Sequence, residues 1–290
     1  MSYNRNYILW ILDSLLVVFI LRSHYLQNVV LLGDCLELMR DIPERSIDMI
    51  CCDLPYGVLH RKNPHAQWDN VIPFDLLWEQ YERIIKDNGA IVLFAQGMFT
   101  AKLMMSNPKL WRYNLVWDKQ RVTGFLNANR MPMRCHEDIC VFYKRLPIYN
   151  PQLFDGAPNH SRGNGKHKET NSCYGKYGRN YQGRTYEEVP RVASTVPNGK
   201  KLPRSIIPIK KEHESKVFHP TQKAVNLIRW LIRTYTNEGA VILDNCCGSG
   251  TTGVAAIKEK RHFICMEKDP KYFEIARKRI NDELMEPTLF

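Results

Sequence analysis

Long apolar runs are scarce in this chain. The apolar stretch at residues 7–21 has 15 residues and contains Asp13. A membrane-spanning helix needs about 20 apolar residues, so the stretch is too short, and its internal acid also opposes a span. No small-residue cleavage site follows it, which disfavours a signal peptide. We therefore expect residues 1–27 to be a hydrophobic N-terminal extension, either an extra packing helix or a segment that the protein does not need, and we do not expect membrane association.

Cysteine motifs that bind metals are absent. The nine cysteines include the adjacent pairs Cys51–Cys52 and Cys246–Cys247 but no C-x-x-C. Adjacent thiols are poorly placed for a metal or for an ordinary disulfide. His136 and Glu137 also lack metal-ligand spacing. We therefore predict no metal site and interpret the thiols as reduced side chains, several of them in the core, of a cytoplasmic protein.

Acidic residues are too few to balance the basic ones. The chain has 41 Lys and Arg against 30 Asp and Glu, a net charge of +11. Residues 150–216 alone hold 13 basic against 6 acidic residues, a net +7. Such a concentration of positive charge predicts a polyanionic partner, with nucleic acid as the first candidate. A solvated basic surface is the simpler alternative.

Strand and helix patterns alternate along most of the sequence. Strands are expected at 28–34, 46–53, 90–95, 113–119, 138–144, 240–244 and 262–267, and helices at 35–42, 73–89, 98–106, 224–235, 251–259 and 270–282. This alternation predicts an α/β fold with a doubly wound, mostly parallel sheet. The alternation stops over 150–216. We therefore expect one α/β domain in two halves, 28–149 and 217–290, separated by an irregular basic insertion.

A glycine-rich loop follows the predicted strand at 240–244. It contains the pattern G-x-G-x-x-G at Gly248, Gly250 and Gly253. Glycines let a backbone approach a ligand closely, and the helix that begins near Thr251 can hold an anion. Glu267 ends the next strand, 23 residues after Asp244, where an acid can bind ribose hydroxyls. The loop therefore predicts a nucleotide-like ligand, with a tight strand–helix turn as the structural alternative.

The position of Asp244 bears on which ligand binds. This acid precedes the first glycine by four residues. A carboxylate is unhelpful beside the pyrophosphate of NAD, but it suits the ammonium group of S-adenosylmethionine. A salt-bridged aspartate in a tight turn remains the structural alternative.

A second strand ends in an unusual group of side chains. The sequence "ICCDLPYG" at 50–57 takes a buried strand directly into a carboxylate, a proline, an aromatic ring and a glycine. Asp53 as a turn cap and Tyr56 as a half-buried surface aromatic are the simplest interpretations. Together with a cofactor loop elsewhere in the chain, a functional interpretation is favoured.

Several motifs resemble those of the DNA amino-methyltransferases. "DLPYG" resembles their D-P-P-Y motif, "DNCCGSGTT" resembles their cofactor loop, and "HPTQK" (219–223) and "GDCLELM" (33–39) resemble flanking motifs. The order of motifs is similar to that of the permuted β class, including compact orphan phage or prophage enzymes. The match covers about residues 28–282. Leu54 and Ala224 depart from it, since each replaces a proline.

The resemblance implies a permuted S-adenosylmethionine-dependent methyltransferase fold and a specific reaction. A methyl group would pass from S-adenosylmethionine to the N6 amine of adenine in double-stranded DNA, after the base is flipped out. Methylation of cytosine N4 is the alternative within the family, and Asp53 in place of serine favours adenine. An NAD-dependent oxidoreductase and a catalytically inactive DNA-binding protein are the alternatives from other classes. The sequence leaves a homodimer open.

The resemblance also implies roles for the catalytic residues. Tyr56 would stack on the flipped base, and the Asp53 carboxylate and the Leu54 carbonyl would each accept one N–H of the amine. Pro55 would keep the turn rigid. Loop 58–72, with Trp68 and Asp69, is either a lid over the base pocket or an ordinary surface loop.

The expected cofactor contacts come from both halves of the domain. They are Asp34, Thr221, Lys223, Asp244, Cys246, Gly248, Ser249, Gly250, Thr251 and Glu267. Asp34 is nearly as well explained as a helix N-cap. His219 is interpreted as a capping or packing residue at least as readily as a general base.

The basic insertion has the position of a target-recognition region. Tyr174, Tyr177, Tyr181 and Tyr186 alternate with positive side chains that neutralise phosphates. The expected DNA-binding residues are Lys176, Arg179, Arg184, Lys200, Lys201 and Arg204. A disordered polar loop is the alternative interpretation.

Overall fold

The computed structural model describes residues 27–58, 69–156, 197, 199–212, 218 and 221–285. The extension at 1–26, Trp68, His219, the four tyrosines of the insertion, and Lys176, Arg179 and Arg184 lie outside the described residues. Two compact units are found, one within 1–150 and 205–290 and the other within 151–204. In the described part of the chain, no helix has the length and apolarity to cross a membrane.

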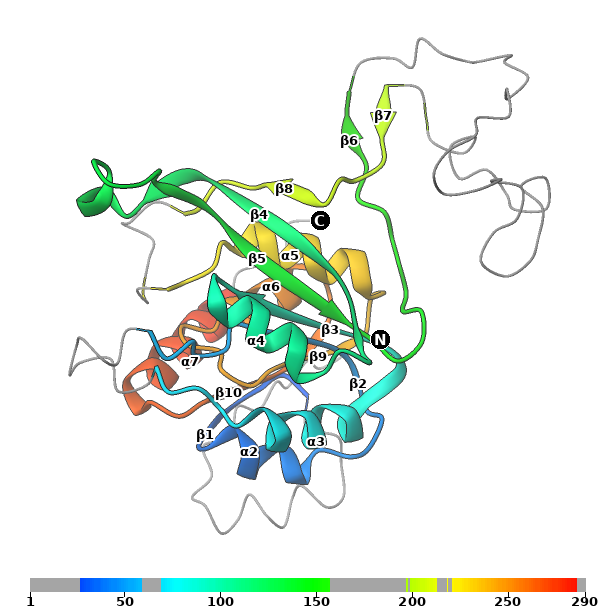
Figure 1. Ribbon diagram of the computed structural model, residues 1–290. Helices are drawn as coiled ribbons and strands as arrows, with labels where there is room; N and C mark the ends of the chain where they lie inside the picture. Colours follow the sequence, from blue (N-terminus) through cyan, green and yellow to red (C-terminus); the bar gives the residue numbers. More distant parts are fainter. Residues whose placement is uncertain are drawn as a thin grey trace. The chain divides into compact units, whose positions relative to one another are not determined.

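The larger unit is built on one eight-stranded sheet (Figure 1). Its strand order is β1-β10-β9-β2-β3-β5-β4-β8. Only β5 runs antiparallel to its neighbours. The strands are β1 (Val29–Leu32), β2 (Ile47–Cys52), β3 (Ile85–Ala95), β4 (Trp111–Thr123), β5 (Arg134–Phe142), β8 (Ile206–Pro208), β9 (Val241–Asp244) and β10 (His262–Glu267).

Helices cover both faces of this sheet. They are α2 (Cys35–Leu38), the 3₁₀ helix η1 (Met39–Asp41), α3 (Phe74–Ile84), α4 (Met98–Ser106), α5 (Val225–Tyr235), α6 (Thr251–Lys258) and α7 (Pro270–Met285). Side chains of β2 alternate between two cores. Cys51 packs with residues of α5, α6 and α7, whereas Cys52 packs with residues of α2, α3 and α4. The predicted doubly wound, mostly parallel α/β fold is confirmed, with helices on both faces as such a sheet requires.

The topological switch point of the sheet, where the strand order reverses, lies between β2 and β9. These strands pair in parallel, Met49 with Ile242 and Ile50 with Leu243. From β2 the chain proceeds through α3 to β3, and from β9 it proceeds through α6 to β10 on the opposite side. In open α/β sheets, ligands bind outside the carboxyl ends of strands at such a switch point. Both loops that the sequence singled out begin there.

The predicted helix at 73–89 is wrong at its end. Helix α3 ends at Ile84, and β3 already begins at Ile85, which pairs with Ile47. The next pair of this ladder joins Ala90 to Met49, so a bulge lies between the two pairs. The apolar spacing of 84–85 fits a helix equally well, and only the pairing with β2 decides the matter.

The predicted insertion at 150–216 extends beyond the smaller unit. Residues 205–212 belong to the larger unit, because β8 adds to the sheet beside β4. The Trp117 indole N–H also donates to the Ile209 carbonyl at 2.7 Å. A three-residue strand within a basic, irregular segment gives no clear sequence signal.

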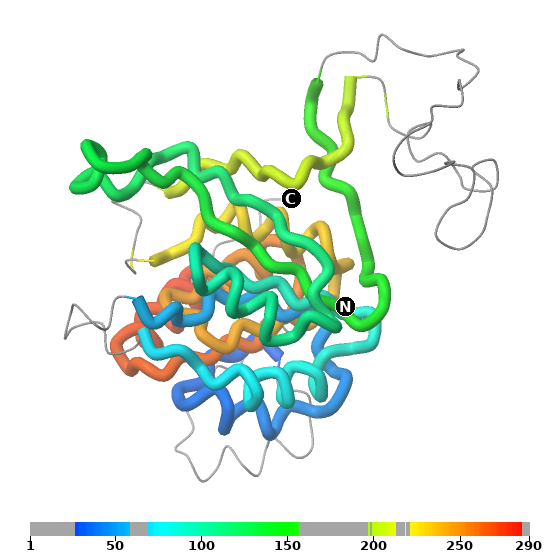
Figure 2. The backbone as a smooth tube through the Cα atoms, viewed as in Figure 1, coloured from blue at the N-terminus to red at the C-terminus, as the bar shows by residue number. Residues whose placement is uncertain are grey.

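The smaller unit contains one short antiparallel pair among its described residues. Strand β6 (Phe154–Asp155) pairs with β7 (Lys200–Lys201). Lys200 forms an ion pair with Asp155 at 2.6 Å, and Arg204 lies over the Phe154 ring at 5.2 Å. The tube in Figure 2 follows the same two strands along the chain.

Glycine is required at position 89, within the bulge of β3. A Cβ there would lie 2.9 Å from the Asp48 carbonyl oxygen and 2.7 Å from Ile85 Cδ1. We expect Gly89→Ala to lower the free energy of unfolding by about 1–3 kcal/mol, because overpacking shifts the backbone. Urea denaturation measures the change as a shift of the midpoint at constant slope. The exposed neighbour serves as a control, since Asn88→Ala should change stability by less than about 0.5 kcal/mol.

Candidate functional site

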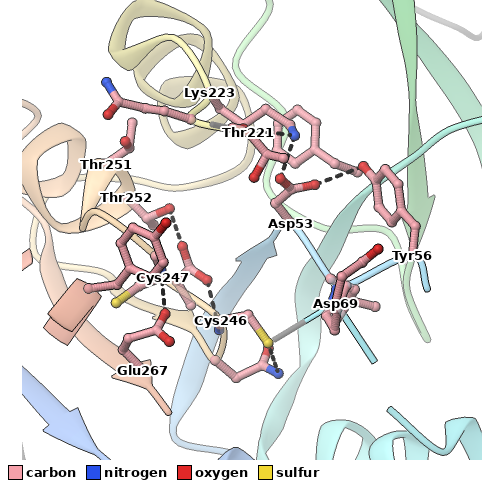
Figure 3. A pocket seen from close by; sticks show the side chains of 18 of the residues that line it. Asp53, Tyr56, Asp69, Thr221, Lys223, Cys246, Cys247, Thr251, Thr252 and Glu267 are labelled. Carbon is pink, nitrogen blue, oxygen red and sulfur yellow. Dashed lines mark hydrogen bonds and ion pairs between the residues drawn. The ribbon is translucent and has the colours of Figure 1, made fainter. Parts of the chain in front are cut away.

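One cavity of about 920 Å³ opens at the carboxyl ends of β2 and β9. It is lined both by Asp53 to Tyr56, which follow β2, and by Gly248, Ser249 and Thr251 of the glycine-rich loop (Figure 3). Tyr56 and Gly248 therefore face the same space although they are far apart in the sequence. The volume is at the upper end of the range of small-molecule and cofactor sites.

Four charged side chains form an alternating row at one wall of the cavity. Lys223 Nζ lies 2.5 Å from Asp53 Oδ2 and 3.2 Å from Glu137 Oε2. Lys119 Nζ lies 3.3 Å from Glu137 Oε1. The row holds two positive and two negative groups, so its formal charges cancel. Lys119 and Lys223 are both buried, and buried charges are stable only when they are paired in this way.

The row keeps Lys223 charged. Burial raises the pKa of Asp53 above its usual value, and the nearby ammonium of Lys223 opposes that rise. Burial alone would lower the pKa of Lys223, but Asp53 and Glu137 together hold it above its usual value. Lys223 therefore remains an ammonium at neutral pH and supplies a fixed positive charge to the Asp53 carboxylate.

The turn after β2 is held rigid by its neighbours. The Tyr56 hydroxyl donates to Asp53 Oδ1 at 2.7 Å, and the Gly57 N–H donates to Asp69 Oδ1 at 2.9 Å. The Tyr56 ring stacks on Phe99 with centroids 4.7 Å apart. Tyr56 lines the cavity and Phe99 does not, so Phe99 supports the ring from behind. One face of Tyr56 is thus available to an aromatic ligand.

Acidic side chains dominate the other half of the cavity. Asp244 Oδ1 accepts from the Cys246 N–H at 3.1 Å and Oδ2 accepts from the Thr252 hydroxyl at 2.5 Å. Burial raises the pKa of Asp244 to about 6. Glu267 Oε2 accepts from the Gly248 N–H at 2.8 Å, and burial raises the pKa of this carboxyl as well. The loop is therefore shaped by hydrogen bonds to two carboxylates.

The segment before α5 is tied directly to the glycine-rich loop. The Ser249 hydroxyl donates to Gln222 Oε1 at 3.0 Å. Gly250 does not line the cavity. It has a φ of +78° and a Cβ there would lie 3.0 Å from Ala276, so it permits close packing on α7. Gly250 therefore acts through packing, unlike the ligand contact that the sequence suggested.

The charges of the cavity discriminate between the two candidate cofactors. Asp34, Asp244, Glu267 and Asp269 all line the half beside the glycine-rich loop. Lys268 also lies there, but it is exposed and pairs with Asp34 at 2.9 Å. A pyrophosphate would meet several carboxylates, whereas an ammonium group and ribose hydroxyls would find acceptors. The residues present therefore fit S-adenosylmethionine better than NAD.

Most predicted cofactor residues line this cavity. They are Asp34, Thr221, Lys223, Asp244, Cys246, Gly248, Ser249, Thr251 and Glu267. Asp34 also caps α2, since its Oδ1 accepts from the Leu36 N–H at 3.0 Å, so both interpretations of this residue hold. Lys223 contacts Asp53 and Glu137, so its ammonium lies beside the Asp53 carboxylate.

Sequence reasoning missed three residues of this site. Lys119 ends a predicted strand without a role, Glu137 is interpreted as structural for lack of metal-ligand spacing, and Gln222 appears only as a letter of the HPTQK motif. A signal for Lys119 exists, because Leu115, Trp117 and Lys119 alternate along β4 and share its buried face. A charged residue on a buried strand face indicates a partner inside the protein. No comparable signal marks Glu137 or Gln222, whose partners come from distant segments.

Comparisons with known proteins agree with this geometry. The sequence profile of a family described as DNA methylase (N6_N4_Mtase) matches residues 47–278. The type II methyltransferase M.HinfI of Haemophilus influenzae is 26% identical over 286 residues, which cover 88% of this chain and 68% of the relative.

Solved structures share the fold at lower identity. The M1.HpyAVI–SAM complex has a TM-score of 0.55 at 22% identity and covers 87% of this chain and 98% of that one. PvuII DNA methyltransferase, described as cytosine-N4-specific, has a TM-score of 0.58 at 16% identity and covers 88% of this chain and 90% of that one. At these identities the structural matches establish the fold alone.

Removal of the Lys223 ammonium tests the charged row. In Lys223→Met, two buried carboxylates lose a shared cation, so we expect a loss of about 3–5 kcal/mol in the free energy of unfolding at about pH 7.5. The folded-state pKa values of Asp53 and Glu137 should rise above their unfolded values. A carboxyl group with a raised folded-state pKa destabilises the fold as pH rises from its unfolded-state pKa to its folded-state pKa. The loss of unfolding free energy in the variant should therefore be smaller at about pH 5 than at about pH 7.5.

Chemical denaturation at both pH values measures this difference. The control is Lys268→Met, which removes an exposed lysine from a surface pair and should cost at most about 1 kcal/mol. Equal, small losses in both variants at both pH values would show that the row contributes nothing to folding.

Proposed function

Because the chain belongs to the N6/N4 family of DNA methylases, we propose that it methylates the N6 amine of adenine in double-stranded DNA with S-adenosylmethionine as donor. The observation that carries the proposal is the shared cavity. It places the Asp53–Tyr56 turn beside an acid-lined, glycine-rich loop. An oxidoreductase would have no use for this turn.

Asp53 is the proposed acceptor for the amine of the target base. A carboxylate offers about four lone-pair sites, and Tyr56 and Lys223 occupy one on each oxygen. The remaining sites can accept an N–H of the amine, together with the Leu54 carbonyl. Two acceptors draw the nitrogen towards a tetrahedral shape and free its lone pair. The carboxylate also stabilises the positive charge that develops on the nitrogen.

The proton released by the amine also needs an acceptor. Burial raises the pKa of Asp53, which makes this carboxylate a better proton acceptor than an exposed aspartate. The ammonium of Lys223 opposes the rise. The pair therefore combines a proton acceptor with a fixed positive charge beside it.

Tyr56 is the proposed platform for the flipped base. Phe99 covers one face of its ring, and its hydroxyl bond to Asp53 fixes the ring orientation. A base stacked on the free face would gain about 1–3 kcal/mol, which offsets part of the cost of leaving the duplex. The same stack would bring the exocyclic amine close to Asp53.

Asp34, Asp244 and Glu267 are the proposed cofactor contacts at the ammonium and ribose groups, with backbone N–H groups near Thr251. S-adenosylmethionine, when bound, supplies an electrophilic methyl group on a sulfonium centre. These residues would hold the cofactor in the half of the cavity next to Asp53. The methyl donor and the amine that accepts the methyl group would then already lie close together, which lowers the entropic cost of the transfer.

The decisive experiment is modified-base sequencing of DNA from cells that express the chain. We expect N6-methyladenine at one recognition sequence, and we expect Asp53→Ala to reduce the mark at least about 100-fold because the amine loses its acceptor. Binding of S-adenosylmethionine, measured by calorimetry, should change by less than about threefold, since Asp53 is not a proposed cofactor contact. The exposed acid in Asp41→Ala is the matched control and should leave the mark unchanged.

Other outcomes of this experiment are equally clear. N4-methylcytosine in place of N6-methyladenine would make the cytosine alternative correct. DNA without any modified base, from cells with folded protein, would contradict the proposed reaction.

The smaller unit is proposed to bind the DNA backbone. We expect the triple change of Lys200, Lys201 and Arg204 to Glu to weaken DNA binding at least about tenfold and to reduce its salt dependence, because phosphate contacts release counterions. The loss should be the same for target and scrambled duplexes, as fluorescence anisotropy would show. Changing Arg45, Lys260 and Lys278 to Glu alters the net charge equally and serves as the control. Equal affinities for the two triple variants would contradict a specific role.

A further inference from the structure

A long hairpin joins β4 to β5 (Figure 1) and carries exposed apolar side chains at its tip. All residues from 122 to 136 are exposed. Phe125 is 80% exposed and Leu126 is 95% exposed, and Val122, Met131 and Met133 are exposed beside them. We call residues 122–133 the hairpin tip. Contiguous apolar groups at the surface usually mark an interaction site.

The hairpin tip is an ordered turn. Gly124 has a φ of +88°, and its carbonyl accepts from the Asn127 N–H at 2.9 Å. The Asn127 carbonyl accepts from the N–H groups of Arg130 at 2.9 Å and Met131 at 3.0 Å. The 3₁₀ helix η2 (Phe125–Asn127) therefore presents its side chains from a preformed backbone, at little further cost in chain entropy on binding.

Charge and position indicate what the hairpin tip contacts. Residues 120–136 contain three arginines and no acidic residue. The base of the hairpin lies at the site, since Lys119 and Thr123 both line the cavity. A polyanion that approaches the cavity would therefore meet a positive arm with an apolar end. A second copy of this chain, with the same positive arm, would be repelled from it.

We propose that the hairpin tip enters the DNA duplex beside the target base, and that Phe125 and Leu126 fill the space that the flipped base leaves in the stack. Apolar wedges of this kind unstack base steps in other DNA-binding proteins. The arginines at 121, 130 and 134 would hold the flanking phosphates. The inference rests on the proposed function, because it assumes that the cavity receives a base from duplex DNA.

The test uses the double variant Phe125→Ala with Leu126→Ala. Its substrates carry the recognition sequence found by sequencing, with the target either paired or opposite an abasic site. We expect methylation of the paired target to fall at least about tenfold, and methylation of the unpaired target to stay within about threefold of the unchanged protein, because only the former needs an unstacking wedge. With 2-aminopurine at the target position, the fluorescence rise on binding should also fall at least about fivefold.

Two control variants make the test specific. Phe125→Leu with Leu126→Met keeps the apolar bulk and should behave like the unchanged protein. Leu146→Ala removes a side chain that is 77% exposed outside the hairpin and should have no effect. Thermal unfolding should be the same for all of these variants, since the altered side chains are exposed.

Several results would overturn the inference. Equal losses on paired and unpaired targets, or no loss on either, would show that the hairpin tip does not assist flipping. A lower molecular mass of the double alanine variant than of the unchanged protein, measured by light scattering, would show that the hairpin tip joins two copies of the chain. Failure of the unchanged protein to methylate either substrate would instead contradict the proposed function, so the two failures are distinguishable.

Discussion

The parallel pairing of β2 with β9 is the constraint on which the site depends. The ladder joins Met49 to Ile242 and Ile50 to Leu243, so the two strands end side by side. Asp53 directly follows β2 and Asp244 is the last residue of β9, although about two hundred residues separate them in the sequence. Because the chain leaves β2 and β9 in opposite directions, no crossover covers the crevice between them. A shift of this register by one residue would turn the apolar side chains of both strands to the wrong faces and remove the cavity.

The two aspartates at this crevice have different partners, and they are therefore suited to different ligands. Asp53 contacts the ammonium of Lys223, which also pairs with Glu137, and Glu137 in turn pairs with Lys119. Among the described residues, no lysine or arginine forms an ion pair with Asp244, whose oxygens accept from a backbone N–H, a hydroxyl and the Cys52 thiol. A cationic ligand can therefore add the missing charge at Asp244 but would be opposed by Lys223 near Asp53. The cavity is thus polarised, with a place for a cationic donor and a separate place for a neutral acceptor.

Local patterns predicted the α/β architecture and both loops because most strands and helices of the larger unit carry their own apolar periodicity. The sequence failed where a tertiary partner decides the outcome. Residues 85–89 continue the helical pattern of α3, but pairing of Ile85 with Ile47 makes them part of β3. Lys223 belongs to a segment that resembles a cofactor motif, yet its ammonium contacts Asp53, because the row that includes Glu137 is assembled from four separate segments. No local sequence pattern predicts an ion pair between distant segments. The only indication in the sequence is a charged residue on an otherwise apolar strand face, as at Lys119.

The reversal of β5 explains why the cavity and the exposed hairpin meet at one edge of the sheet. Since β5 is antiparallel to both β3 and β4, β4 runs parallel to β2 and ends at the same edge as β2 and β9. The hairpin that joins β4 to β5 must therefore emerge beside the cavity. Lys119 lies where β4 leaves the core, and Glu137 lies on β5 opposite Trp117, so two members of the charged row stand at the base of the hairpin. A single antiparallel strand in a parallel sheet thus supplies Glu137, the shared partner of Lys223 and Lys119, and one side of an arm beside the cavity.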